Sequence, residues 1–568
     1  MKSELNPKRA SADAAFSRDI RELTSAEFLA LLGRKNIQLQ ARDERLTVNA
    51  PAGVLDDQLR AELKLRKADL LAFLGLQKDV SSNSPLLAVK RGGRIPMTPT
   101  QQGIWLIDHF DPGNVAYNIP EAFLFPASLE LETLQKSVDL LIARHEILRT
   151  SFHEGDGDLY QEIAAATHTK IGFTDLRSFP EAEVISKCRA LIREHSQQPF
   201  DLRRAPLVRF HVFRGTPERD VLLINIHHII ADLQALFILR EELMTCYKAF
   251  VAKMTPELPE PSLQFADYAV WADQQLREGM MDRQVRYWRE KLAGLPPFLE
   301  LPISAEYPEQ RSALGSKVAI VVPAPVRGSL TRIGRKCGAT PFMTFLAAFA
   351  VLLGRFSGQY DFCIGSPVTQ RTRMETQRMI GLFMNLVAFR IQMDPQQSFR
   401  DILQQVRATA LEAYEHRDVP FQTLVRALRF NRRSPRSAIF QVMFGFEPAM
   451  AADPSFWQFD SDPGTARYDL SLLLNESTDG NIYGFLEYRT DIFKDAEIAA
   501  LSGRFLSLLQ ELSDNPDRPG ISKPSANDVK TVVSESELPS AEPPTAPGST
   551  LFGRISKVFS AGPDKRKR

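Results

Sequence analysis

IHHIIAD, residues 226–232, places two histidines and an aspartate directly after an apolar run. The run, VLLINI at residues 221–226, predicts a buried strand, and Asp232 stands where a following helix would begin. Such a strand would deliver His227 and His228 into a loop beside a bound substrate. A neutral imidazole is well suited at pH 7 to accept a proton or to hydrogen-bond a developing charge.

Other interpretations of the histidine pair remain open at this point. Adjacent histidines at a strand end are often only a polar exit from a core. A metal site is disfavoured, because consecutive strand residues point to opposite faces and His227 and His228 cannot readily share one ion. A serine or cysteine nucleophile is unsupported, since the sequence has no GxSxG or comparable elbow. We therefore expect no metal, and the motif alone leaves the function open.

The composition is that of a folded, nearly neutral protein. The 568 residues allow two or three domains, with 44% hydrophobic and 24% charged residues. The formal net charge of +1 provides no field to attract a polyanion, so nucleic acid is not an expected partner. The four cysteines form no CxxC pair, which argues against a zinc site and a disulfide framework. With no signal peptide and no apolar run long enough for a transmembrane segment, we expect a cytoplasmic protein.

The first part of the chain predicts a small module. A polar, disordered lead is expected over residues 1–20. Residues 21–76 then show a capping box at Thr24 and Glu27, a helix that stops near Gly33, a hairpin around residues 42–44, and a second helix over 55–74. Residues 77–94, rich in Ser, Asn, Pro and Gly, predict a linker.

The body, residues 95–512, mixes β-rich hairpins with long amphipathic helices, which indicates an α/β or α+β fold. Residues 513–568 are rich in Pro and Ser and predict a disordered tail. Near the end of this tail, LFGRISKVFS (551–560) has its apolar residues on one face of a possible short amphipathic helix.

Seven ordered segments of the body resemble motifs of the condensation domains of nonribosomal peptide synthetases. Their order and spacing both agree with that family. The segments are TPTQQGIW (98–105), RHEILRTSF (144–152), IHHIIAD (226–232), FADYAVW (265–271), IGLFMN (380–385), HRDVPFQTLV (416–425) and SPRSAIFQVMF (434–444).

The resemblance implies two chloramphenicol-acetyltransferase-like lobes, residues 95–272 and 273–512, arranged as a V-shaped pseudo-dimer around a tunnel. Donor and acceptor carrier proteins would bring phosphopantetheine arms into that tunnel from opposite faces, and the protein would need no cofactor of its own. The implied reaction is acyl transfer, in which a carrier-bound acyl, peptidyl or polyketide thioester forms an amide or ester with an amine or hydroxyl acceptor. Since the sequence has no adenylation signature and no GGxS carrier motif, we expect a free-standing protein whose substrates are loaded elsewhere.

The resemblance also implies roles for residues of the site. His228 would deprotonate the acceptor or steady the tetrahedral intermediate, while His227 packs inside the lobe. Asp232 would pair with an arginine that supports the loop, and Arg149 is the first candidate for that arginine, before Arg144. Asn385, in IGLFMN, would lie near the tunnel, although it could equally be a turn residue.

The sequence departs from the family pattern HHxxxDG at Leu233, which stands where the family has glycine. A leucine there restricts the backbone and would reshape the acceptor side of the tunnel. A polyketide or fatty acyl donor is compatible with that change. The departure also keeps open a second interpretation, a catalytically inactive recruitment module that binds carrier proteins or tailoring enzymes. A third, an epimerase of the same fold, lacks a separate signature in the second lobe.

Residues 21–76 resemble the small TubC-type docking domains found at the front of some hybrid synthetase subunits. The implied fold is α-β-β-α. Such domains accept a short C-terminal peptide of an upstream subunit as an added strand, and a hairpin with an open edge suits that use. An upstream synthetase subunit is therefore an expected partner.

Overall fold

The computed structural model describes most of the chain from Gln38 onward. The predicted lead at residues 1–20, the first helix of the docking module and the amphipathic segment at 551–560 lie outside the described residues. Those described are 38–42, 45–49, 55–65, 84–125, 127–216, 219–279, 281–303, 306–309, 312–428, 436–447, 457–459 and 461–520.

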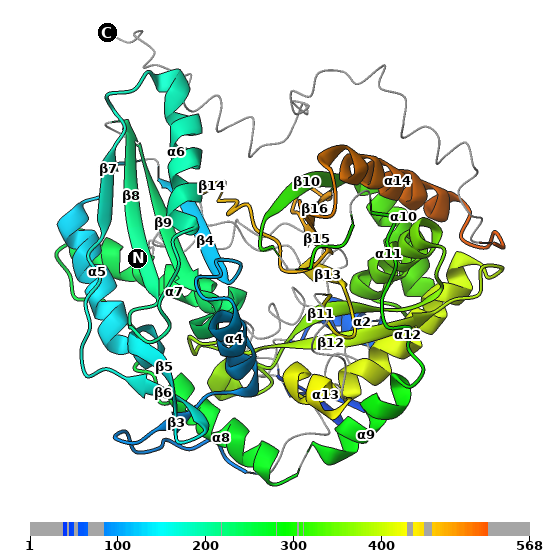
Figure 1. Ribbon diagram of the computed structural model, residues 1–568, viewed down its shortest axis with the longest axis horizontal. Helices are drawn as coiled ribbons and strands as arrows, with labels where there is room; N and C mark the ends of the chain where they lie inside the picture. Colours follow the sequence, from blue (N-terminus) through cyan, green and yellow to red (C-terminus); the bar gives the residue numbers. More distant parts are fainter. Residues whose placement is uncertain are drawn as a thin grey trace, which may run out of the picture.

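The N-terminal lobe is built on a five-stranded sheet in the order β14-β4-β9-β8-β7. Strand β9 is buried from Asp220 to His227, as expected for a strand covered on both faces. Helices α5 and α7 cover one face and α6 covers the other (Figure 1). The elements are β4 (Asn118–Phe125), α5 (Leu131–Arg144), β7 (Gly172–Asp175), α6 (Glu181–Ser196), β8 (Val208–Thr216), β9 (Arg219–His227) and α7 (Leu233–Val251).

A three-stranded sheet, β3-β6-β5, completes this lobe together with shorter helices. Strand β6 pairs with both β3 and β5, and Phe152 of β5 is fully buried in the core of the lobe. These elements are β3 (Ile95–Pro96), α4 (Pro99–Phe110), η3 (Glu146–Arg149), β5 (Thr150–Gly155), β6 (Asp158–Ile163), η4 (His228–Ile230) and α8 (Phe265–Arg277).

The C-terminal lobe carries a six-stranded sheet in the order β10-β16-β15-β13-β11-β12. Strand β13 runs parallel to β11 and β15, and the other pairs are antiparallel. Helix α11 is buried from Met343 to Gly354 in the core of this lobe. The strands are β10 (Gly315–Val322), β11 (Asp361–Thr369), β12 (Met384–Gln392), β13 (Val442–Glu447), β15 (Leu470–Glu476) and β16 (Ile482–Arg489). The helices are α9 (Asp282–Lys291), α10 (Ala324–Lys336), α11 (Pro341–Ser357), η5 (Met374–Thr376), α12 (Phe399–Glu415), α13 (Phe421–Ala427) and α14 (Asp495–Asp514).

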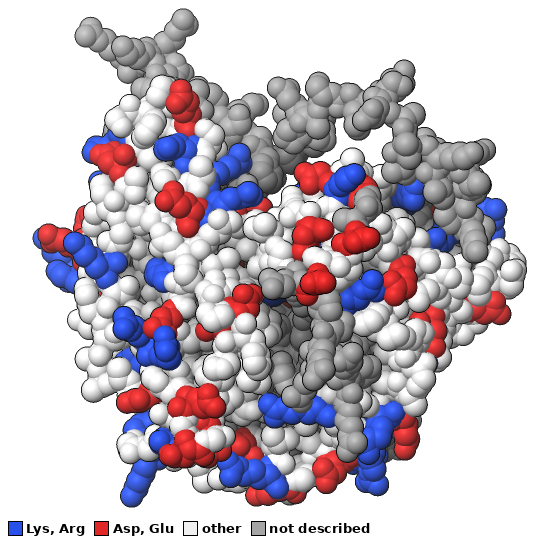
Figure 2. Space-filling view, viewed as in Figure 1, with Lys and Arg blue, Asp and Glu red and all other residues white. Residues whose placement is uncertain are grey.

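The mixed α/β fold in two lobes is thus confirmed. In Figure 1 the lobes lie side by side and diverge between α6 and α14. Charges of both signs are interspersed over the face drawn in Figure 2, as the balanced composition predicts. Among the described helices no single one has the length and hydropathy of a membrane span, and α10 with α11 pass that test only as a pair bent by 105°.

Two segments cross from the second lobe into the first, so the sequence boundary at 272/273 does not separate the lobes in space. Strand β14 (Trp457–Phe459) pairs with β4, with Trp457 opposite Leu124. Met379, Ile380 and Phe383, between η5 and β12, belong to the hydrophobic core of the N-terminal lobe. The N-terminal lobe is therefore completed by residues 379–383 and 457–459, which lie far beyond residue 272 in the sequence.

The described part of the docking module contains its hairpin and part of its second helix. Strands β1 (Gln38–Arg42) and β2 (Arg45–Asn49) pair in register around the predicted turn. Helix α2 (Asp57–Leu65) begins two residues after the predicted start at residue 55, with Leu59 and Leu63 buried, and the predicted helix beyond Leu65 lies outside the described residues.

The predictions of a free linker and a free tail are wrong for their described parts. Within residues 84–94, Leu86 is buried in the N-terminal core and Trp271 donates its indole N–H to the Ser84 carbonyl. The predicted tail begins inside α14, which extends to Asp514, and Asp517 then pairs with Arg400 of α12. The local amino-acid composition does not reveal that these two segments are ordered, because a few contacts with distant residues hold each of them.

Candidate active site

Three hydrogen bonds from other segments hold the backbone of the histidine loop. The His227 N–H donates to the Leu207 carbonyl at 2.9 Å, and the His228 N–H donates to the Tyr117 carbonyl at 2.8 Å. The amide of Gln101, a fully buried side chain of α4, donates to the Ile229 carbonyl at 3.1 Å. The end of β9 and the η4 turn therefore have a defined position.

The ring of His228 leaves one nitrogen available. Its Nδ1 lies 2.7 Å from the Ala231 carbonyl oxygen, which can only accept, so Nδ1 carries the proton. The lone pair then resides on Nε2, which has no hydrogen-bond partner among the described residues. The residue is 5% exposed. A neutral imidazole with a free Nε2 can accept a hydrogen bond from an attacking group.

His227 has the opposite tautomer and a packed ring. Its Nδ1 lies 3.3 Å from the Ile229 backbone N–H, which can only donate, so the proton of the neutral ring is on Nε2. The ring meets Phe200 edge-on at 6.0 Å between centroids, and the residue is 2% exposed. These contacts assign His227 to the structure of the loop.

Both histidines are neutral at pH 7. Burial lowers the pKa of His228 to about 3, helped by the nearby positive charge of Arg467. Burial also lowers the pKa of His227 to about 3, with further lowering by His228, Arg467 and Arg209. A ring that stays unprotonated keeps its lone pair for hydrogen bonding over the whole physiological range.

Asp232 is the N-cap of α7 and pairs with Arg371. Arg371 Nη2 lies 2.9 Å from Oδ1 and its Nε lies 3.3 Å from Oδ2. The carboxylate also accepts the backbone N–H groups of Ala235 at 2.7 Å and Phe383 at 3.0 Å. Arg371 in turn donates to the Met379 carbonyl at 2.7 Å and lies over the Phe383 ring. The pair thus connects the histidine loop to the crossing segment before β12.

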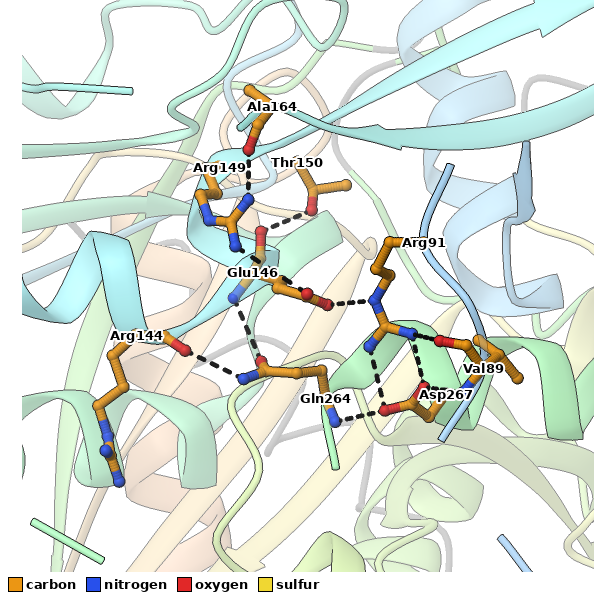
Figure 3. A network of polar contacts seen from close by, with 9 residues as sticks. All are labelled: Val89, Arg91, Arg144, Glu146, Arg149, Thr150, Ala164, Gln264 and Asp267. Carbon is orange, nitrogen blue, oxygen red and sulfur yellow. Dashed lines mark hydrogen bonds and ion pairs between the residues drawn. The ribbon is translucent and has the colours of Figure 1, made fainter. Parts of the chain in front are cut away.

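The prediction that Arg149 or Arg144 pairs with Asp232 is wrong. Figure 3 shows both arginines in a separate network, where Arg149 donates to the Ala164 carbonyl and approaches Glu146 at 3.9 Å. Arg144 Nε lies 3.2 Å from Glu242, a buried carboxylate of α7. Arg144 is the last residue of α5 and Arg149 is the last residue of η3. Their side chains contact Glu242, Ala164 and Glu146 instead of Asp232.

The same network fastens the segment before β3 to the lobe. Arg91 lies between two carboxylates, at 2.8 Å from Glu146 and 2.7 Å from Asp267, and Asp267 also accepts the Val89 N–H (Figure 3). Gln264 bridges the Glu146 N–H and the Arg144 carbonyl. Arg144 and Arg149 therefore belong to a network that attaches the segment before β3 to the N-terminal lobe.

Asn385 and Leu233 occupy different environments. The Asn385 amide is 1% exposed and donates to the Arg417 and Val419 carbonyls, both at 2.7 Å, while its oxygen accepts the Phe421 N–H at 3.0 Å. All its polar atoms are engaged, so the side chain joins β12 to α13, and its place near the tunnel stays a prediction. Leu233 is 42% exposed at the first turn of α7, beside Asp232.

Sequence reasoning missed Arg371, Gln101 and Tyr117 as parts of this site. Gln101 had a local signal, because Thr98 and Gln101 form a capping box, but nothing local pointed to Ile229. Arg371 follows β11 in a stretch with three arginines, and only the fold distinguishes it from Arg373 and Arg378. Within the described residues, no group of three or more His, Cys, Asp or Glu side chains is arranged to hold a metal ion.

Comparison with known proteins identifies two domain families in the chain. The condensation-domain family model matches residues 92–529, and the TubC N-terminal docking-domain model matches residues 26–75. The chain is 39% identical to a linear gramicidin synthase protein of Brevibacillus parabrevis over 453 residues, 78% of this chain and 6% of that protein. It is 32% identical to the phosphinothricin tripeptide synthetase PhsC of Streptomyces viridochromogenes, over 75% of this chain and 40% of the relative.

The chain thus spans well under two thirds of the length of these relatives. Among solved structures, the X-domain from teicoplanin biosynthesis matches with a TM-score of 0.70 and 26% identity, covering 78% of this chain and 99% of that one. Its complex with OxyB matches with a TM-score of 0.69 and 27% identity, covering 77% and 97%. The chain belongs to the condensation-domain family of nonribosomal peptide synthetases and carries a TubC-type docking domain in front.

Proposed function

We propose that this protein is an acyltransferase that joins a carrier-bound acyl or peptidyl thioester, including polyketide chains, to an amine or hydroxyl acceptor. The observation that carries the proposal is the tautomer of His228. Its Nδ1–H is committed to the Ala231 carbonyl, which leaves the Nε2 lone pair for the acceptor. The Asp232–Arg371 pair holds the loop that presents this ring.

The chemistry needs little beyond placement of the two reactants. The acceptor nitrogen attacks the thioester carbonyl carbon while His228 Nε2 accepts a hydrogen bond from its N–H. The C–N bond forms, the C–S bond breaks, and the proton leaves with the thiol. Orientation of two tethered reactants supplies much of the rate enhancement, and a positioned base typically adds about 10²- to 10⁴-fold. Phosphopantetheine arms of partner carrier proteins would bring both reactants, so the chain needs no cofactor of its own.

The docking module supports a place for the protein downstream of another synthetase subunit. Strands β1 and β2 form a two-stranded sheet within the described residues, so the hairpin has outer edges that an incoming strand can pair with. An extended peptide from the upstream partner would add there through backbone hydrogen bonds.

A second candidate is a recruitment module without catalysis. Two observations favour it: the similarity to X-domains, one of them in complex with OxyB, and the low exposure of His228 at 5%. Such a module would bind a carrier or a tailoring enzyme and leave the thioester intact. The retained His228 with a free Nε2 favours the transferase.

The decisive experiment compares His228→Ala with His168→Ala. His168 is a histidine 62% exposed that pairs with Asp139 outside the site. Each variant and the wild type would be incubated with a panel of acyl thioesters on holo carrier proteins and a panel of amines, followed by mass measurement of products. We expect His228→Ala to lose about 10²- to 10⁴-fold in rate and His168→Ala to match the wild type. Equal product from all three would refute the catalytic role, and carrier binding without any turnover by the wild type would establish the recruitment module.

Leu233 is the residue we propose for acceptor selection. It follows Asp232 directly and is exposed although apolar, so it can contact a substrate that reaches His228. Replacing it with glycine would remove the side chain beside the loop. We expect Leu233→Gly to change the ratio of kcat/KM between small and large acceptors while the donor preference stays as in the wild type. The same ratio in both proteins would exclude this role.

A further inference from the structure

Arg467 reaches from the C-terminal lobe to the segment that precedes β4. It lies where the chain returns from β14 to β15, a stretch that contacts both lobes. Its Nε donates to the Ala116 carbonyl at 2.8 Å, and its guanidinium lies 5.4 Å from the centre of the Tyr117 ring. A planar guanidinium that hydrogen-bonds one residue and stacks on the next fixes both.

The Ala116–Tyr117 peptide is in turn a direct support of His228. The Tyr117 carbonyl accepts the backbone N–H of His228 at 2.8 Å. The Tyr117 ring lies 6.5 Å from the His228 ring and 6.4 Å from the His227 ring, between centroids. Arg467 is therefore linked through two consecutive residues to the backbone of His228, from the opposite lobe.

The charge of Arg467 also acts on the histidines. After burial, the positive charge of Arg467 is the next contribution that lowers the pKa of His228. The His228 ring faces the Ala231 carbonyl of the histidine loop, and the nearby Asp232 is paired with Arg371. Arg467 also interacts through its charge with the partly buried Glu487 of β16, which lies near Lys317, and Lys317 also pairs with Asp462.

We propose that Arg467 is a positioning residue that sets the place of the His228 ring from the C-terminal lobe, so that the reactive geometry forms only when the two lobes are in contact. This inference rests on the proposed transferase function. Arg467 itself need not touch a substrate, since its contacts are with Ala116 and Tyr117.

The test compares Arg467→Met and Arg467→Lys with Arg193→Met. Arg193 Nη2 contacts Asp462 across the lobes at 3.0 Å, in the same returning segment, but the contacts of Arg193 do not include Ala116 or Tyr117. Arg193→Met thus removes a cross-lobe arginine without disturbing the support of His228. With acyl carrier and amine substrates, we expect Arg467→Met to lower kcat by about 10- to 100-fold with KM nearly unchanged, as for a misplaced catalytic group. Arg193→Met should keep the wild-type kcat.

A second readout does not depend on turnover. In protein labelled at the histidine Cε1 carbons, the His228 signal, assigned from its loss in His228→Ala, is recorded by NMR at pH 7. We expect its chemical shift in Arg193→Met to match the wild type and to move in Arg467→Met and in Arg467→Lys, because the Tyr117 ring, 6.5 Å from the His228 ring, loses the guanidinium that lies against it.

These readouts separate the inference from the proposed function. An unchanged His228 signal in Arg467→Met would overturn the inference, and so would a wild-type kcat in that variant. If Arg467→Met does not fold, a wild-type kcat in Arg467→Lys would also overturn the inference. A lysine ammonium cannot reproduce the contacts that the planar guanidinium makes with both Ala116 and Tyr117. If the wild type has no turnover, the transferase proposal fails while the NMR comparison still decides whether Arg467 acts on His228.

Discussion

The guanidinium of Arg371 and the carboxylate of Asp232 form a buried two-point ion pair between a crossing segment of the C-terminal lobe and the histidine loop. Arg371 Nη2 lies 2.9 Å from Asp232 Oδ1, and the two side chains are 3% and 9% exposed. The Asp232 carboxylate also caps α7 and accepts the Phe383 N–H. Asp232 thus joins α7 to the segment between β11 and β12, which reaches in from the other lobe.

Removal of Arg371 should therefore be costly. Arg371→Met leaves the Asp232 charge buried with only backbone donors, and breaking one partner of a buried pair typically costs about 3–5 kcal/mol. We expect that loss in the free energy of unfolding, measured by urea denaturation. Arg378→Met is the matched control, since Arg378 lies on the same crossing segment but is 61% exposed, with the 62% exposed Glu241 of α7 at 2.9 Å and Glu242 only at 3.9 Å. A loss of under about 1 kcal/mol for both variants would contradict the role given to the pair.

Gly381 is required for close packing at the end of that segment. A Cβ at Gly381 would overlap the Phe265 ring, and the Gly381 carbonyl accepts the Asp232 backbone N–H. We expect Gly381→Ala to lower the free energy of unfolding by about 1–3 kcal/mol, as overpacking does. Gly503→Ala, on an exposed face of α14 with open space at the Cβ position, should instead stabilise by up to about 1 kcal/mol. Equal effects of the two substitutions would argue against the packing explanation.

The buried histidines predict a loss of stability on mild acidification. Burial holds the pKa of His227 at about 3, below the ordinary 6.5, so below pH 6.5 the unfolded chain binds a proton that the folded protein does not. The stability that the neutral ring contributes is complete above pH 6.5 and falls as the pH drops toward 3, by up to about 1.4 kcal/mol per pH unit. Urea unfolding at pH 7, 6 and 5 should show a smaller slope for His227→Phe than for the wild type. An unchanged slope in His227→Phe would be the contrary result.

Arg91 should hold the segment before β3 on the lobe. Its partner Asp267 has a side chain 1% exposed, so Arg91→Met leaves a buried carboxylate with fewer donors, a change that typically costs about 1–3 kcal/mol. We expect faster proteolytic cleavage near residues 84–94 in this variant, followed by gel electrophoresis and mass measurement. Arg94→Met removes an exposed pair with Asp156 in the same segment and should be cut at the wild-type rate. Equal cleavage of both variants would show that Arg91 does not hold the segment.

Much of the site was accessible from local sequence because it lies on one short stretch. The apolar run before His227 predicts the buried strand β9, and Asp232 predicts the start of α7, as the structure has them. These features depend on backbone propensity and side-chain patterns within a few residues, which are present in the sequence itself.

The sequence by itself determined the family, the order of the motifs and the mixed fold, and it predicts the two histidines as the chemical centre. The tertiary structure alone decided which arginine meets Asp232, that the Asn385 side chain joins β12 to α13, and that Arg467 approaches the histidine loop from the other lobe. The physical reason is distance along the chain: Arg371 lies 139 residues from Asp232, and only the packing of the crossing segments brings these groups together. Local patterns record the propensity of each element, whereas the partner of a buried charge depends on how the elements pack.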